Sequence, residues 1–252
     1  MARIELRDVT IYIQDGLSGT GNLTANGANT DTTLNINNVV LNTTDTDLVP
    51  VGARLTVNGE TADTVHTVTA RDPADTSPTT CITITPALGP GTYNSGNVEG
   101  ALTFINQRIE VKIGEGNLTW SEAKEYEYLL DRGNLDTVKE GDEQPVEMNL
   151  EFVYEYVKTQ SGQAITPVDA LKQSGEASEW VTTSSDACEP YCVDILAKHC
   201  VPCGTPYDED VLFVDFRYES LDFDMGEATI AVSGRCNVSE PTVTRSDDTE
   251  CA

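Results

Sequence analysis

Basic side chains are scarce in this chain, and the shortage excludes whole classes of function. It has 15 Lys and Arg against 42 Asp and Glu, a net charge of -27. Such a surface repels nucleic acid and anionic membranes, so neither is an expected binding partner. The sequence contains no run of about 18 apolar residues, the length needed to span a bilayer. The first residues, MARIELRDVTIYI, lack the apolar core of a signal peptide, so we expect synthesis in the cytoplasm.

Catalytic signatures are also lacking. There are only two histidines and no G-x-S-x-G motif, which argues against a Ser-His-Asp hydrolase. We therefore expect no enzymatic activity and no cofactor.

Four of the seven cysteines form a C-x3-C-x7-C-x2-C pattern, and it is the one candidate metal site. The members are Cys188, Cys192, Cys200 and Cys203. Both short spacings suit tetrahedral zinc binding, but the gap between the pairs is shorter than the roughly 15–20 residues of the familiar pattern. Buried thiols, or disulfides formed after release from the cell, are the alternatives, and we expect no metal.

Composition divides the chain into two regions. Residues 18–103 are rich in Thr, Asn, Gly and Ala and carry only eight acidic and two basic side chains. We therefore predict a discontinuous domain of residues 1–16 and 104–252, with residues 17–103 inserted as a second, smaller β domain. Within the insert, four segments alternate apolar residues with Thr or Asn, which predicts short strands in a small barrel or sandwich. These segments are TTLNINNVVL, ARLTVNGE, VHTVTAR and CITITPAL.

The second region also reads as mostly strand, with one helix. A strand is expected from Val146 to Val157, because apolar and polar residues alternate strictly along it. The segment KEYEYLL predicts another strand shortly before it. A helix is expected after Thr166, where Thr166 caps, Pro167 takes the first position and Asp169 completes a capping box, and Gly175 is expected to end it. Between the two strands, the charged stretch from Asp131 to Pro145 shows no hydrophobic period.

One long segment resembles the core of the tail tube, or major tail, proteins of tailed bacteriophages. It reads IEVKIGEGNLTWSEAKEYEYLLDRGNLDTVKEGDEQPVEMNLEFVYEYV. The start RIELRDVTIYIQDG and the later segments CEPYCVDI, VDFRYESLDFDMGEATIAVSG and PTVTR also resemble that family. The resemblance covers residues 1 to about 16 and about 104 to 245, and its specificity lies in length and order. The inserted region departs from a minimal tube protein and resembles, more weakly, small β modules of phage virion proteins.

The resemblance implies a mainly β fold of two packed antiparallel sheets with one flanking α-helix, in addition to the inserted domain. It also implies six copies in a ring, rings stacked into a tail tube, and a place in the virion after assembly in the bacterial cytoplasm. Expected partners are other copies of the chain and further tail proteins: a terminator, a tape measure protein, and a baseplate or tip. Duplex DNA would pass through the acidic lumen without specific binding. The insert would project outward, which favours a non-contractile tail.

Two groups of residues acquire roles under this interpretation. The polar stretch becomes an arm that reaches the adjacent ring, with Asp131, Arg132, Asn134, Leu135, Asp136, Val138, Lys139, Glu140, Asp142 and Glu143 as its assembly residues. The polar faces of the long strands supply candidate lumen carboxylates, namely Glu125, Glu127, Glu147, Glu151 and Glu155. Alternation shows which residues share a face, but the direction of that face stays open. The alternative function is a ligand-binding β-sandwich of a surface or adhesion protein.

Overall fold

The chain is mainly β, and it forms two compact units. The computed structural model describes residues 9–25, 27–62, 64–94, 100–111, 117–132, 134–153, 157–158, 164–186, 188–199 and 208–246. The first unit comprises Met1–Ile13, Val111–Glu155 and Cys192–Ala252, and the second comprises Gln14–Glu110 and Tyr156–Tyr191. The second unit therefore contains the expected insert together with a later segment that the sequence had placed in the other domain. Strand β8 (Arg108–Val111) lies where the chain passes from the second unit to the first.

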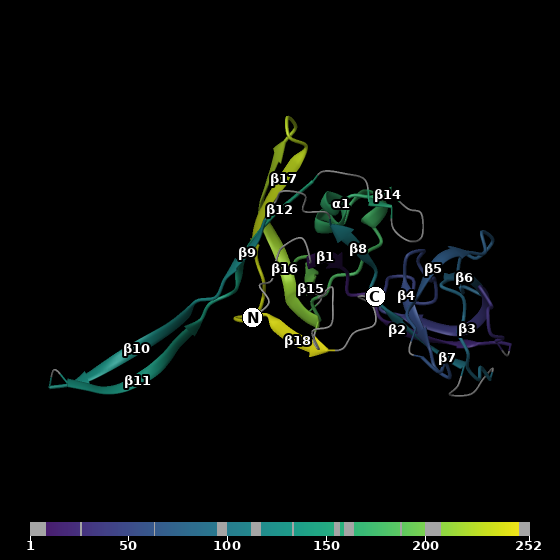
Figure 1. The fold of residues 1–252 in the computed structure, drawn as a ribbon, viewed down its shortest axis with the longest axis horizontal. Coiled ribbons are helices and arrows are strands. Elements are labelled where there is room, and N and C mark those ends of the chain that lie inside the picture. The colour runs from purple at the N-terminus through teal and green to yellow at the C-terminus, as the bar shows by residue number, and fades with distance from the viewer. Residues whose placement is uncertain are drawn as a thin grey trace. The chain divides into compact units, whose positions relative to one another are not determined.

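The first unit is built on a large sheet in which β9, β12, β15, β16, β17 and β18 pair antiparallel with their neighbours (Figure 1). Its strands follow the order β8, β1 (Val9–Gln14), β15 (Val193–His199), β16 (Asp208–Asp224), β17 (Thr229–Arg235), β12 (Glu147–Val153) and β9 (Leu118–Ser121). Strand β18 (Thr242–Ser246) pairs with β16 outside this order.

Strand β12 (Glu147–Val153) confirms the predicted alternation, whereas Tyr154, Glu155 and Tyr156 of the predicted strand lie outside the described residues. Met148, Leu150 and Phe152 are buried, while the intervening residues are exposed. The described pairing with β17 extends to Val153, which lies opposite Thr229, the first residue of β17. Downstream, β13 (Val157–Lys158) instead pairs with β14 (Ala164–Ile165) in a separate two-stranded sheet.

The polar stretch after Asp131, expected to form an assembly loop, is a strand. Strand β11 (Asn134–Glu143) pairs antiparallel with β10 (Lys124–Asp131), and the two form a sheet of their own. The pairing contains two irregularities, one between Lys124 and Tyr126 and one between Leu129 and Leu130. Because each bulge shifts the alternation, β11 shows no regular hydrophobic period in its sequence.

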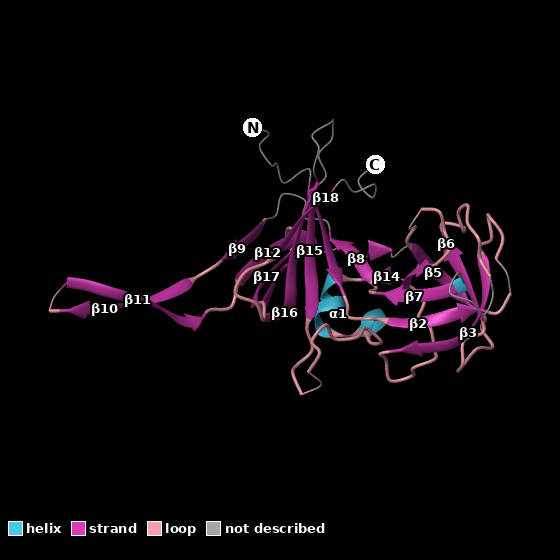
Figure 2. Cartoon of the chain, turned by 90° about the horizontal axis from the view of Figure 1, so that it is seen from below, coloured by secondary structure: helices cyan, strands magenta, loops and turns pink. Residues whose placement is uncertain are grey.

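The second unit contains a closed barrel, seen in Figures 1 and 2. Its strands follow the order β2 (Gly19–Leu23), β3 (Thr33–Leu41), β6 (Cys81–Thr85), β5 (His66–Arg71), β4 (Arg54–Val57) and β7 (Ala101–Ile105). The four strands predicted in this region are confirmed as β3, β4, β5 and β6. Most of their apolar residues point inward and form the core together with those of β2 and β7. The core includes Leu34, Ile36, Leu55, Val68, Ile82, Ile84, Leu102 and Phe104.

Helix α1 (Pro167–Lys172) begins as predicted. The Thr166 hydroxyl accepts a hydrogen bond from the Asp169 backbone N–H at 3.1 Å, and the Asp169 carboxylate accepts one from the Thr166 backbone N–H at 3.2 Å. The helix ends earlier than predicted, because Gln173 already adopts the left-handed conformation, with φ 50°. Gly175 instead opens a short 3-10 turn, η3 (Gly175–Ala177).

Candidate functional site

The β10–β11 hairpin carries an exposed apolar face. In the register, Tyr128 lies opposite Val138 and Leu130 lies opposite Leu135, and Tyr126 shares their side of β10. These five side chains remain between 47% and 64% exposed. Isolated apolar residues at a surface need no explanation, but five adjacent ones on one face form an unpartnered patch. We call this face, made of Tyr126, Tyr128, Leu130, Leu135 and Val138, the apolar arm face.

The opposite face of the hairpin is polar. Glu127 lies opposite Lys139, Leu129 opposite Thr137, and Glu125 occupies the same side of β10. The hairpin turn runs from Asp131 to Asn134, and Arg132 between them has φ 51°. Positive φ is typical of the tight turns that join hairpin strands.

All ten predicted assembly residues therefore lie on this hairpin, at the end of β10, in the turn or along β11. The side chains of Asn134 and Asp136 lie outside the described part. Sequence reasoning missed Tyr126, Tyr128 and Leu130, which form the other half of the apolar arm face. Their signal was present in the alternation of KEYEYLL, but only the pairing with β11 shows that they continue a patch.

The candidate lumen carboxylates do not lie on one surface element. Glu125 and Glu127 belong to the hairpin, whereas Glu147 and Glu151 lie on the exposed face of β12 in the large sheet. Glu155 lies outside the described residues. The five side chains were expected on the polar faces of the long strands, and the four described ones divide between the hairpin and the sheet.

The polar face of the large sheet carries charges of both signs. Asp222 shares this face with Glu147 and Glu151, through the pairing of β12 with β17 and of β17 with β16. Arg235 also lies there, opposite both Glu147 and Arg217. Its guanidinium contacts the Glu147 carboxylate at 2.9 Å and the Glu219 carboxylate at 3.4 Å. Acidic groups outnumber the two arginines on this face. The hydrogen bond to Glu147 raises the pKa of Arg235 above its ordinary value, so this side chain stays charged.

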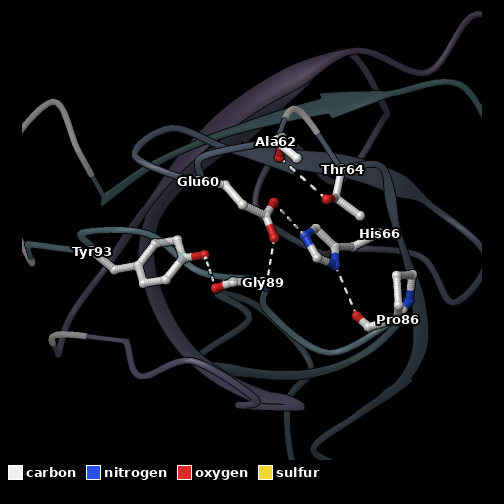
Figure 3. Close-up of polar contacts among 7 residues, drawn as sticks. All are labelled: Glu60, Ala62, Thr64, His66, Pro86, Gly89 and Tyr93. Carbon is white, nitrogen blue, oxygen red and sulfur yellow. Dashed lines mark hydrogen bonds and ion pairs between the residues drawn. The ribbon is translucent and has the colours of Figure 1, made fainter. Parts of the chain in front are cut away.

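A buried histidine and glutamate form a polar cluster at the barrel (Figure 3). The side chains of His66 and Glu60 are 0% and 1% exposed, and their Nε2 and Oε2 atoms lie 3.0 Å apart. His66 Nδ1 lies 2.8 Å from the carbonyl oxygen of Pro86, which only accepts hydrogen bonds, so Nδ1 carries a proton. The backbone N–H of Gly89 donates to Glu60 Oε1 at 2.5 Å. This cluster is fully paired, which indicates a structural role.

A second buried carboxylate, Asp15, joins three segments of the second unit. It accepts hydrogen bonds from the backbone N–H groups of Gln107, Leu17 and Val181 at 2.6, 3.2 and 3.2 Å, and from the Gln107 side chain at 3.2 Å. Burial nevertheless raises the pKa of Asp15 to about 7, because these hydrogen bonds only partly offset the loss of solvation.

The described cysteines do not form a metal-binding cluster. Cys188 is exposed, Cys192 is buried, and Cys200 and Cys203 lie outside the described residues. Within the described residues, no three metal-binding side chains come together. Burial, with added repulsion from Asp194 and Asp215, raises the pKa of the Cys236 thiol to about 12, so this thiol stays protonated at neutral pH.

Comparisons of the chain with protein-family models, curated proteins and solved structures give no match. Within the described part of the chain, none of the helices is long and apolar enough to cross a membrane.

Proposed function

We propose that this protein is a structural subunit of a phage tail tube. Six copies form a ring, rings stack into a tube, and the β10–β11 hairpin of one copy contacts a copy in the next ring. The barrel is an exterior addition to this subunit. Other tail proteins bind at the ends of the tube, and duplex DNA passes through the lumen during genome ejection. The resemblance in sequence suggests the family, and the β10–β11 hairpin is the structural feature that supports the proposal.

The apolar arm face is the observation that carries the proposal. An isolated two-stranded hairpin is at best marginally stable in water. A hairpin of 18 paired-strand residues that also exposes two tyrosines, two leucines and a valine gains stability when another surface covers those side chains. A second copy of the chain is the natural occupant, because a repeating assembly presents the same receiving surface at every level.

The large sheet supports the ring contact. Among the described strands, β9 has a neighbour, β12, on one side only, and its other edge is free to pair with a neighbouring copy. Proteins rarely leave such edges unprotected, because exposed backbone groups invite association. In a closed ring, each edge pairs with a neighbouring copy, and the association stops after one turn.

The charge of the chain suits a conduit for DNA. A cationic wall would bind phosphates and slow the genome, whereas an acidic wall repels the duplex from all sides. With Glu147, Glu151 and Asp222 against Arg217 and Arg235, the polar face of the sheet is acidic but not uniformly so. We assign this face to the lumen.

Negative-stain electron microscopy of the concentrated protein tests the proposal. Sixfold rings or tubes of stacked rings are the expected result. Protein that stays monomeric at every concentration and ionic strength would contradict it. A reconstruction of the tube that placed Glu147 and Glu151 on the outer surface would contradict the lumen assignment while leaving the tube assignment standing.

A further inference from the structure

A second exposed apolar surface lies where β16 turns into β17. Phe223 is 48% exposed and Met225 is 80% exposed, although both side chains are large and apolar. In the register, Phe223 lies opposite Ile230, which lies opposite Phe152, and both of these residues are fully buried. Phe223 therefore continues an apolar row of the sheet towards solvent, and Met225 follows it in the turn. We call Phe223 and Met225 the apolar turn.

Hydrogen bonds fix the shape of this turn. Asp224 Oδ1 accepts hydrogen bonds from the backbone N–H groups of Gly226 at 2.8 Å and Glu227 at 3.3 Å. Such bonds are typical of Asx turns, in which a side chain takes the place of a backbone acceptor. Ala228 has φ 52°, the left-handed conformation found in tight hairpin turns. The apolar turn is therefore presented on a preorganised element, which lowers the entropic cost of binding.

The apolar turn and the hairpin lie at opposite ends of the same sheet. Ser121, the last residue of β9, pairs with Glu147, the first residue of β12, and the hairpin leaves the sheet at this end. At the other end, Val153 pairs with Thr229, the residue that follows the β16–β17 turn. A projection at one end and an acceptor at the other allow copies to associate head to tail. Such a heterologous contact repeats along an axis.

Charge matches the tip of the hairpin to the turn. Residues 221–229 contain three acidic side chains and no Lys or Arg. Arg132 is exposed at the hairpin tip, close in sequence to Leu130 at the end of the apolar arm face. Asp131 lies between them, and alternation along β10 directs it to the opposite face from Leu130. A guanidinium placed beside Asp224 or Glu227 would offset part of the repulsion between two acidic copies.

We infer that the apolar turn of one copy receives the apolar arm face of the next copy. This inference rests on the proposed function, because a second copy is the occupant only if copies stack. In the contact, Leu130 packs on Phe223 and Met225, and Arg132 lies against the acidic side chains of the turn. Both apolar surfaces leave water together, so each copy covers the patch that the other exposes.

The other exposed apolar residues of the first unit do not suit this role. Trp120 pairs with Met148, one residue from the end of the sheet where the hairpin leaves it. Tyr218 belongs to the same row, because it pairs with Gly234, which pairs with Met148. An acceptor in this row would lie beside the base of its own hairpin and not at the opposite end. Val243 on β18 stands between two threonines and forms no apolar pair along its strand.

Complementation between two variants tests the contact. The arm variant carries Tyr128→Ser and Leu130→Ser, and the turn variant carries Phe223→Ser and Met225→Ser. Sedimentation velocity should show that each variant alone stacks at least about tenfold more weakly than the wild type, because each lacks one half of the contact. An equimolar mixture should form stacks of two layers and no long tubes. The intact hairpin of the turn variant then binds the intact turn of the arm variant, and no further layer can add.

A matched control separates this effect from a general loss of exposed apolar area. Val243→Ser removes an exposed apolar side chain of the same unit outside both surfaces, and it should stack like the wild type. Thermal unfolding of each variant establishes that it is folded. Met225→Ser alone serves as the turn variant should Phe223→Ser lower stability, since Met225 is the more exposed of the two.

Three results would overturn the inference. A folded turn variant that stacks as well as Val243→Ser would exclude the apolar turn as the acceptor and leave the tube assignment standing. A mixture that associates no more than the separate variants would show that the hairpin and the turn do not meet each other. Wild-type protein that never associates would overturn the proposed function and this inference together.

Discussion

Asp15 makes the stability of the second unit depend on pH. Burial raises its pKa to about 7, from the ordinary value of 3.8 for an exposed side chain. The folded protein therefore keeps the proton to a higher pH than the unfolded chain does. The two states bind protons differently, so the contribution of Asp15 to the free energy of unfolding depends on pH. It is fully present below about pH 4 and is lost as the pH rises through 7.

We predict that Asp15→Asn removes this pH dependence. The unfolding free energy of the wild type, relative to the variant, should fall by up to about 4 kcal/mol between pH 4 and pH 8. Urea denaturation over a pH series measures it, with Glu176→Gln as an exposed control that should follow the wild type. If the unfolding free energies of the wild type and Asp15→Asn changed with pH in the same way, Asp15 would ionise as an ordinary carboxyl. The substitution also lowers stability by a constant amount at all pH values, because an amide cannot accept hydrogen bonds at both terminal atoms. Only the change of stability with pH tests the prediction.

The Glu60–His66 pair should behave as one energetic unit. Removing one partner leaves the other buried and unpaired, so we expect His66→Ala and Glu60→Ala each to cost about 3 kcal/mol of unfolding free energy. The double variant should lose at least about 1 kcal/mol less than the sum of the two, because it leaves neither group alone. Denaturant unfolding of the four proteins measures this coupling. Strictly additive losses would mean that the 3.0 Å contact contributes nothing of its own.

At the scale of elements, the hairpin separates folding from assembly. Replacing Tyr128 and Leu130 with Ser removes apolar area that is exposed in the single chain, so the unfolding free energy should change by less than about 0.5 kcal/mol. Tube formation should be lost or strongly reduced, because the apolar arm face then has little area to bury. Electron microscopy and sedimentation measure assembly, and Glu127→Gln on the opposite face is the control. Normal tubes from the double variant would exclude the apolar arm face as the contact between rings.

The hairpin also shows which elements could not be predicted from the sequence alone. The alternation of β12 and the capping box of α1 depend on neighbouring residues, and both were predicted correctly. The pairing of β11 with β10 depends on two bulges, whose positions leave no regular period in the sequence.

At the scale of the whole molecule, net charge opposes assembly. Each copy carries -27, so neighbouring copies repel one another unless salt screens the charge. The Debye length falls from about 10 Å at 0.1 M salt to about 3 Å at 1 M, while apolar contacts persist. We predict that the assembled fraction rises with sodium chloride concentration at fixed protein concentration. Sedimentation velocity measures that fraction. A fraction that falls with salt would point to ion pairs, and not the apolar arm face, as the main contact.

The sequence by itself determined the β class, the four predicted barrel strands, the start of α1, the faces of β12 and the strong acidity. Each of these follows from local pattern or from composition. Only the tertiary structure decided which strands pair, and therefore that Tyr128 and Leu130 share a face with Val138 and Leu135. It also decided that Asp15 and Glu60 are buried. Burial depends on segments far apart in the chain, and it is burial that turns ordinary side chains into groups with an unusual pKa or an obligatory partner.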